Sequence, residues 1–233
     1  MASSGNDVRL LETALGAPRP GGELHRGIAV IQGIPCNGHS VVATRIVSMS
    51  ETSARERLKE LIQELAIVRG KVTLSSGKEA DYYIDLRRVS LQQEASGLIG
   101  EVMLDLLDEA KLEFTNVGGL TMGADPVGTA IMHTARTRGR SLDAFVVRKA
   151  QKSYGMGRQV EGPSVEGRNV IVLEDTSTTG GSALTAVEGV RKAGGNVIAV
   201  AVIVDRDTGA KERIEAEAGV PYLFAYGKTE LGL

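Results

Sequence analysis

The sequence predicts an α/β fold with a mostly parallel, twisted sheet flanked by helices. Beyond about residue 111, candidate strands and helices alternate, which is typical of a parallel sheet with crossover helices. The candidate strand at 169–174 is apolar over most of its length, as expected of a strand covered on both faces. Glycine makes up 29 of the 233 residues, which favours tight turns and close backbone approaches. In such a sheet, ligands bind at the carboxyl ends of the strands.

Residue spacing predicts the individual elements. Ser53 and Glu56 form a capping box before leucines at helical intervals, so we expect a helix over about 52–68, ended by Gly70. Apolar residues then alternate around a Ser-Ser-Gly turn, which predicts a hairpin between about 71 and 89. Further helices are expected at about 91–111, 126–138, 180–193 and 209–218, and strands at 116–119, 144–148, 169–174, 197–205 and 222–226.

The first 48 residues differ from the rest. Prolines and glycines interrupt every candidate helix or strand there, so we expect residues 1–48 to form a poorly ordered leader. Acidic residues are few, which leaves a transit peptide open; a translation start at Met49 is the other explanation. The remainder, 49–233, is expected to be one domain, with a small subdomain at about 52–90 and a core at about 91–233.

Overall composition excludes several classes of protein. The net charge is -2 and the pI is about 6.0, so no basic surplus indicates a nucleic-acid partner. The single cysteine, Cys36, excludes a disulfide framework and a multi-cysteine metal site, which fits a reducing cytoplasm. No apolar run reaches the roughly 18 residues of a membrane span. We therefore expect a cytoplasmic protein with no nucleic-acid and no membrane partner.

The most informative segment is an apolar strand that leads into two carboxylates and a hydroxyl- and glycine-rich turn. Glu174 and Asp175 are followed by Thr-Ser-Thr-Thr-Gly-Gly-Ser at 176–182, just before a helix. Hydroxyls, glycine amides and the positive end of a helix together form a site for a phosphate monoester. The two acids would repel a bare phosphate, but they accept hydrogen bonds from sugar hydroxyls and attract magnesium. The segment therefore indicates a sugar phosphate, and it lacks the lysine of a nucleotide-binding P-loop.

The run at 170–183, VIVLEDTSTTGGSA, resembles the 5-phosphoribosyl 1-diphosphate (PRPP) motif of type I phosphoribosyltransferases. The resemblance extends from about residue 52 over most of the chain and narrows to the orotate phosphoribosyltransferases. It implies the type I phosphoribosyltransferase fold, with 52–90 as a hood, and magnesium held mainly by PRPP. It also implies a catalytic part for Glu174 and Asp175. The PRPP-binding residues that it implies in this segment are Glu174, Asp175, Thr176, Ser177, Thr178, Thr179, Gly180, Gly181 and Ser182.

Three cations gather within 148–152, at the end of a predicted strand. They form either a solvated charge run or a mobile basic loop over a pyrophosphate leaving group. The segment resembles the family's R-K-x-x-K-x-H-G loop, which implies that Arg148, Lys149, Lys152 and Tyr154 bind PRPP, with Lys152 the catalytic cation on the leaving group. In that family the loop closes over the neighbouring subunit, which implies a homodimer with shared active sites. Tyr154 replaces the usual histidine and can still donate one hydrogen bond.

Two segments narrow the resemblance to orotate. Arg206 follows the strand at 197–205, where its planar fork can grip a carboxylate or pair with a neighbouring aspartate. Orotate differs from uracil by such a carboxylate, and the resemblance implies that Arg206 and Thr178 contact orotate. It further implies that Tyr83 and Ile84 flank the base, although tyrosines that fill a small hood core would fit the sequence equally well.

Two loops depart from the family pattern. Ser75 stands where many members carry lysine, so no PRPP contact is inferred there. The loop at 118–126 resembles the family's pyrophosphate loop, but Met122-Gly123 replaces an aromatic-lysine pair, which shifts anion binding to the basic loop and magnesium. His133, in the helix that follows, is expected to be structural.

The resemblance implies transfer of phosphoribose from PRPP to orotate, which gives orotidine 5′-monophosphate and pyrophosphate on the way to UMP. Two alternatives stay open. One is a phosphoribosyltransferase for another base, and the other is a PRPP-sensing regulatory protein without turnover. The pI near 6.0 counts against a nucleic-acid-binding regulator.

Overall fold

The computed structural model describes residues 52–73, 79–149 and 159–233. The predicted leader at 1–48 and the Ser-Ser-Gly turn of the hairpin lie outside these ranges, and both stay predictions. Within the described part of the chain, no helix combines the length and the apolar character needed to cross a bilayer.

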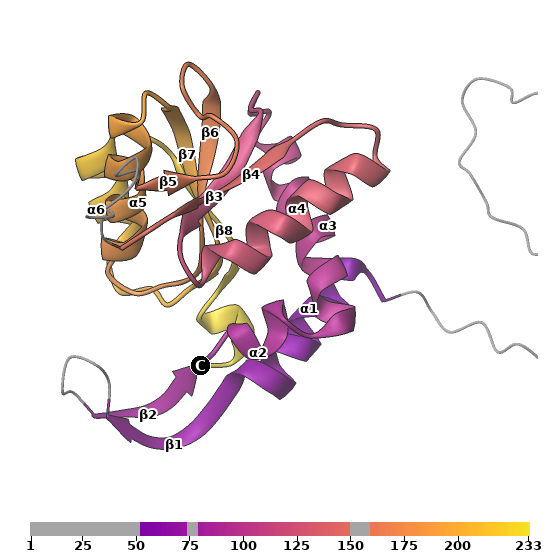
Figure 1. Cartoon of the computed structure of the whole chain (residues 1–233). Coiled ribbons are helices and arrows are strands. Elements are labelled where there is room, and N and C mark those ends of the chain that lie inside the picture. The colour runs from indigo at the N-terminus through magenta and orange to yellow at the C-terminus, as the bar shows by residue number, and fades with distance from the viewer. Residues whose placement is uncertain (1–51, 74–78, 150–158) are drawn as a thin grey trace, which may run out of the picture. The chain divides into compact units, whose positions relative to one another are not determined.

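Among the described residues, a six-stranded sheet forms the centre of the core (Figure 1). Its strands lie in the order β5-β4-β3-β6-β7-β8, and β5 alone runs antiparallel to its neighbour. The predicted mostly parallel sheet is thus confirmed. The strands are β3 (Asn116–Leu120), β4 (Asp143–Val147), β5 (Val160–Glu161), β6 (Asn169–Ser177), β7 (Asn196–Asp205) and β8 (Tyr222–Gly227).

Helices cover both faces of this sheet, as its apolar strands require (Figure 1). Strand β6 shows why, because alternate side chains of a strand point to opposite faces. Ile171 and Leu173 are buried in the apolar cluster of one face, with α3 and α4. Val170 and Val172 are buried in the cluster of the other face, with α5 and α6. The helices are α3 (Gln93–Glu109), α4 (Ala124–Thr137), α5 (Gly181–Lys192) and α6 (Ala210–Ala218).

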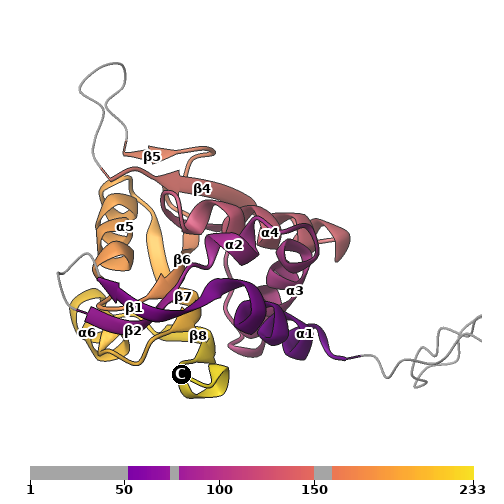
Figure 2. The same cartoon turned by 90° about the horizontal axis from the view of Figure 1, so that it is seen from below.

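The hood precedes the core in the sequence and contains the predicted antiparallel hairpin. In Figure 1 this hairpin lies below the end of the sheet at which β8 leads into η2 (Thr229–Leu231), and Figure 2 shows it from below. The hood therefore faces the carboxyl ends of the parallel strands. Its elements are α1 (Ala54–Leu61), the π-helix η1 (Ile62–Ala66), β1 (Ile67–Thr73), β2 (Glu79–Ile84) and α2 (Arg87–Ser90).

Boundaries within the hood differ from the prediction. The first helix ends at Ala66, and Gly70 does not end it but lies within β1 at φ +133°. The β1–β2 ladder is irregular between Arg69 and Val72, so Gly70 serves a bulge, a conformation that glycine adopts without a Cβ clash. The hairpin also stops at Ile84, and the short helix α2 replaces the predicted end of the second strand.

Three features of the core differ from the prediction. Strand β6 continues to Ser177 instead of ending at 174, so the two acids lie inside the end of the strand. Strand β5 and the 3-10 helix η2 were not predicted. Elements of two and three residues are too short to produce a periodic pattern in the sequence.

Helix α1 attaches the hood to the last strand of the core. The Tyr226 hydroxyl donates to the carbonyl oxygen of Arg55 at 2.7 Å, and the Arg55 guanidinium lies 4.6 Å from the centroid of the Tyr226 ring. Arg55 also pairs with Glu230 at 3.0 Å. Leu58 and Ile62, from the hood, are buried in the same apolar cluster as the core helices. Hood and core are therefore packed against each other through one continuous apolar core.

Candidate active site

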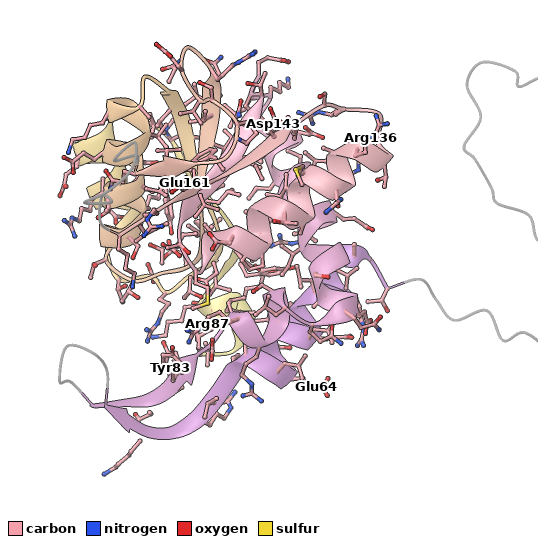
Figure 3. All side chains as sticks on the ribbon, in the orientation of Figure 1. Glu64, Tyr83, Arg87, Arg136, Asp143 and Glu161 are labelled. Atoms are coloured by element: carbon pink, nitrogen blue, oxygen red, sulfur yellow. The ribbon has the colours of Figure 1, made fainter. Side chains whose placement is uncertain are left out.

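A cavity of about 320 Å³ opens where the hood meets the ends of β3, β6 and β7. From the hood it receives the end of β2 and the start of α2, and Figure 3 shows Tyr83 and Arg87 together on the side of the hood that faces the core. The sheet thus carries its cavity at the predicted edge. The predicted site residues that line it are Tyr83, Ile84, Lys149, Glu174, Asp175, Thr176, Thr178, Ser182 and Arg206.

Two adjacent carboxylates form the polar wall of this cavity. Glu174 is only 7% exposed, and its Oε2 atom has no hydrogen-bond partner among the described residues. Asp175 Oδ1 accepts a hydrogen bond from the backbone N–H of Thr176 at 2.6 Å, while the buried Thr176 hydroxyl lacks a partner in the same part of the chain. Buried polar atoms without partners are uncommon, so these atoms indicate where a ligand supplies hydroxyl groups or a cation.

Burial also changes the acidity of the pair. Burial, together with the negative charge of Asp175, raises the pKa of Glu174 to about 8. The pKa of Asp175 is raised as well, mainly by burial and against the hydrogen bond from Thr176. A ligand that offers hydroxyl donors or positive charge would stabilise the ionised form of both carboxyl groups. Without such a ligand, burial makes that ionised form unfavourable.

This acidity predicts how stability depends on pH. Glu174 binds its proton more tightly in the folded protein, so its contribution to stability is complete below about pH 4.5 and is lost as the pH rises through about 8. We expect the free energy of unfolding of the ligand-free protein to fall with pH in this window, relative to Glu174→Gln, by up to about 1.4 kcal/mol per pH unit. Urea unfolding of the wild-type protein and of Glu174→Gln at several pH values measures this difference in the free energy of unfolding. If the two free energies change with pH in the same way, the raised pKa is contradicted.

The turn after β6 forms a second cavity, of about 110 Å³, that shares residues with the first. Gly180 caps α5 with φ +74°, which leaves the first amides of that helix without helical partners beside the turn. A Cβ atom on residue 180 would lie 2.8 Å from Ile214 Cγ1, so both conformation and space require glycine. The predicted phosphate-binding residues are brought together here: Thr176, Ser177, Thr178, Thr179, Gly180, Gly181 and Ser182.

Side chains at and before α6 hold the back of this turn. The Thr208 hydroxyl donates to the carbonyl oxygen of Thr178, and Arg213 Nη1 donates to that of Thr179 at 3.1 Å. Because these carbonyl groups accept hydrogen bonds from the side of α6, the amides and hydroxyls of the turn stay available to an anion.

The loop after β3 comes close to the acid pair because it contains Gly123. A Cβ atom at this position would lie 2.6 Å from Glu174 Oε1 and 2.8 Å from Asp175 Oδ1, so a larger residue would push both carboxylates aside. The Thr121 hydroxyl donates to Asp125 Oδ2 at 2.7 Å, which ties the loop to the first turn of α4. The predicted pyrophosphate loop therefore borders the cavity, whereas His133 is exposed on α4 and does not line it.

Arg206 reaches the cavity from the end of β7. Its guanidinium carbon lies 5.4 Å from the centroid of the Tyr82 ring, and Lys228 Nζ lies 5.9 Å from the same centroid. Within the described ranges Arg206 forms no ion pair with a neighbouring aspartate, and its buried Nε atom has no hydrogen-bond partner. Tyr83 and Ile84 line the cavity, where contact with a base stays a prediction, while Tyr82 faces these two cations. Arg206 is thus positioned to receive an anionic group.

The basic segment is only partly described. Lys149 lines the main cavity, but Arg148 lines neither cavity, and its guanidinium lies 3.9 Å from the Glu161 carboxylate. Lys152 and Tyr154 lie outside the described residues. The structure thus brings one of the four predicted residues to the site, and the roles of Arg148, Lys152 and Tyr154 stay predictions.

Two charged residues of the cavity were not predicted from the sequence. Asp85 and Arg87 follow Tyr83-Ile84 directly and line the same wall. The hairpin prediction extended through both, and in a strand two residues apart share one face. The spacing of Asp85 and Arg87 therefore indicated that the two side chains lie on one face of the hairpin. It did not indicate that this face lies against the core.

Known proteins resemble this chain in sequence and in structure. The phosphoribosyl transferase domain family matches residues 98–221. The chain is 64% identical over 182 residues to the orotate phosphoribosyltransferase of Streptomyces coelicolor, with 78% of this chain and 99% of that protein covered. It is 65% identical over 179 residues to that of Streptomyces avermitilis, with 77% and 97% covered.

Solved structures give the same result. The crystal structure of Mycobacterium tuberculosis orotate phosphoribosyltransferase in complex with PRPP is similar with a TM-score of 0.67 and 52% sequence identity, over 78% of this chain and 100% of that one. Sequence and fold thus agree. The chain belongs to the phosphoribosyltransferase family and, within it, to the orotate phosphoribosyltransferases.

Proposed function

We propose that the main cavity and the turn beside it bind PRPP and orotate and join them to give orotidine 5′-monophosphate and pyrophosphate, a step in UMP biosynthesis. The observation that carries the proposal is the pair of neighbouring cavities, which share lining residues. The turn at 178–182 suits the 5′-phosphate, the Glu174–Asp175 pair suits the ribose hydroxyls, and Arg206 suits the orotate carboxylate. The high identity to orotate phosphoribosyltransferases supports this choice of base.

The reaction exchanges one bond at the anomeric carbon for another. The ring nitrogen of orotate bonds to this carbon, while the bond to the diphosphate oxygen breaks and its electrons leave with pyrophosphate. The proton of the ring nitrogen passes to the departing pyrophosphate or to solvent. Positive charge develops on the ribose as the bond breaks, and the carboxylates of the buried Glu174 and the half-buried Asp175 stabilise it. The hood borders the cavity, and closure over the bound substrates would exclude the water that otherwise hydrolyses PRPP.

Magnesium fits this site as a companion of the substrate. No group of three histidine, cysteine or acidic side chains gathers among the described residues, so the protein offers no cage of its own there. Magnesium is often held by one or two carboxylates together with substrate phosphates, and the acid pair provides such a partner. When bound, the ion supplies positive charge to the diphosphate.

The active form is a cytoplasmic homodimer in which the basic segment of one subunit completes the site of the other. The resemblance of 148–154 to the family's loop supports this arrangement. Lys149 itself lines the cavity of its own chain. In it, Lys152 neutralises the leaving group, assisted by Arg148 and Tyr154. Light scattering would test the assembly, because one chain has a mass of 24.6 kDa.

An assay of the purified protein with PRPP, magnesium and a panel of bases tests the proposed function. We expect pyrophosphate to be released when orotate is the base and not when any other base of the panel is added. Release with another base and not with orotate would indicate a different phosphoribosyltransferase. PRPP binding without turnover on any base would indicate a regulatory protein.

Arg206→Gln is expected to weaken orotate binding by at least about tenfold, because the carboxylate loses a charged hydrogen-bond partner. PRPP affinity should stay within about twofold, and the preference for orotate over uracil should shrink, since uracil has no carboxylate. Steady-state kinetics with both bases measures the change.

Lys228→Gln is the matched control for this substitution. Lys228 lies over the same Tyr82 ring but does not line the main cavity. An equal loss of orotate affinity in Lys228→Gln would show that the cations anchor the hood through Tyr82, and that Arg206 does not grip the base.

A further inference from the structure

A guanidinium that has no part in the reaction described above stands on the hood side of the cavity. Arg87, the first residue of α2, lines this wall together with Asp85 and Tyr83 (Figure 3). Asp85 Oδ1 accepts hydrogen bonds from Arg87 Nε at 2.7 Å and from its backbone N–H at 3.3 Å. Arg87 Nη2 lies 3.5 Å from the Tyr83 hydroxyl. Asp85 therefore holds the guanidinium by its Nε side and leaves most of its Nη donors available.

The position of Arg87 within the cavity follows from its relation to Asp175. Burial raises the pKa of Asp175, and the positive charge of Arg87, which lines the same cavity, opposes part of this rise. Gly123 approaches the same carboxylate from the core, since a Cβ atom added to it would lie 2.8 Å from Oδ1. Arg87 and the loop at 121–123 thus border one acid from two sides. The turn that suits the 5′-phosphate has its own cavity, which Arg87 does not line.

We infer that Arg87 binds the diphosphate group of PRPP and the pyrophosphate product, and that Asp85 is the positioning residue that holds its guanidinium in place. The inference rests on the proposed function, which places the anomeric carbon beside the acid pair. A planar fork of donors suits two oxygens of a diphosphate. The loop at 121–123 contains no cation, and its one hydroxyl, that of Thr121, already donates to Asp125. The hood therefore supplies fixed positive charge on this side of the cavity.

A purely structural role for the Asp85–Arg87 pair predicts different behaviour. The side chains are 23% and 44% exposed, and ion pairs with this much access to water contribute little to stability. If Arg87 served only Asp85, its replacement would leave every ligand affinity unchanged.

Calorimetric titration with two probes tests the inference. Magnesium pyrophosphate reports on the diphosphate position, whereas orotidine 5′-monophosphate carries the phosphate, ribose and base without a diphosphate. Arg87→Gln is expected to weaken pyrophosphate binding by about tenfold and to leave the nucleotide within about twofold. Arg87→Lys should recover part of the loss, and Asp85→Asn should lose less than Arg87→Gln.

Arg88→Gln is the matched control, because Arg88 is adjacent, exposed and absent from the cavity wall. It should change neither affinity. Equal weakening of both ligands in Arg87→Gln would place this residue on the nucleotide and overturn the inference, as would unchanged pyrophosphate binding. If Arg87→Gln fails to fold, Arg87→Lys decides in its place. Wild-type protein that binds pyrophosphate but makes no product from orotate would overturn the proposed function alone.

Discussion

Asp175→Asn is expected to lower kcat/KM for PRPP by about a hundredfold. Asparagine keeps the shape of the side chain but loses its charge and presents an amide donor to the ribose hydroxyls. The effect is large because Asp175 is adjacent to the buried Glu174, where a charge acts through less water than at the surface. Positive charge grows on the ribose as pyrophosphate leaves, so the carboxylate stabilises the transition state more than the bound substrate. Steady-state assays with varied PRPP measure the loss.

Asp143→Asn provides the control for this prediction. Asp143 is exposed at the first residue of β4, at the amino end of the strand and away from Tyr83 and Arg87 (Figure 3). Its replacement should leave kcat/KM unchanged. Pyrophosphate affinity should fall less in Asp175→Asn than in Arg87→Gln, since pyrophosphate has no ribose and Asp175 reaches it only through magnesium. Full activity of Asp175→Asn would remove the acid pair from the site and with it the assignment of the ribose position.

The core of the fold could be predicted because local patterns and tertiary packing agree there. Strand β6 is apolar at Val170, Ile171, Val172 and Leu173, and all four side chains are buried. Helix α3 was predicted from an apolar stripe at helical spacing, and Ile99 in that stripe is buried. Such elements are specified by their own residues, so their order along the chain is enough to predict a covered parallel sheet.

The acid pair and the phosphate turn were predictable for a related reason. Glu174, Asp175 and the residues at 176–182 are contiguous, so one stretch of sequence contains the whole arrangement. The fold needed only to place the end of β6 at the open edge of the sheet. That β6 continues to Ser177 was hidden, because Thr and Ser fit a strand and a turn equally well.

Contacts between distant segments could not be read from the sequence. Arg206 lies near the ring of Tyr82, and Arg87 acts on Asp175, yet each pair is separated by many residues. These contacts depend on how the hood packs over the strand ends, to which buried hood residues such as Leu58 and Ile62 contribute. No local period reports such packing, so a charged residue two positions after Tyr83-Ile84 gives no sign that it enters the cavity.

The largest loss of stability is expected from Gly119→Ala. Gly119 lies in β3 between β4 and β6 and is paired with Leu173. An alanine Cβ would lie 2.0 Å from the Leu173 carbonyl oxygen and 2.8 Å from Ala124 Cβ. Because the first obstacle is backbone, β6 would have to move away from β3. Overpacking costs about 1–3 kcal/mol and occasionally more, so we expect a loss of about 3 kcal/mol in the free energy of unfolding. This corresponds to a Tm lower by roughly 10 °C.

Gly128→Ala makes the same chemical change where space is available. Gly128 lies in α4, and the atom nearest to its added Cβ would be 3.6 Å away, an ordinary contact. Alanine in a helix is favoured over glycine by up to about 1 kcal/mol, so this variant should be slightly more stable. Thermal unfolding of both variants therefore should give shifts of opposite sign. Leu173 immediately precedes Glu174, so the molecules of Gly119→Ala that fold should also bind PRPP less tightly, because the displaced strand carries the acid pair with it.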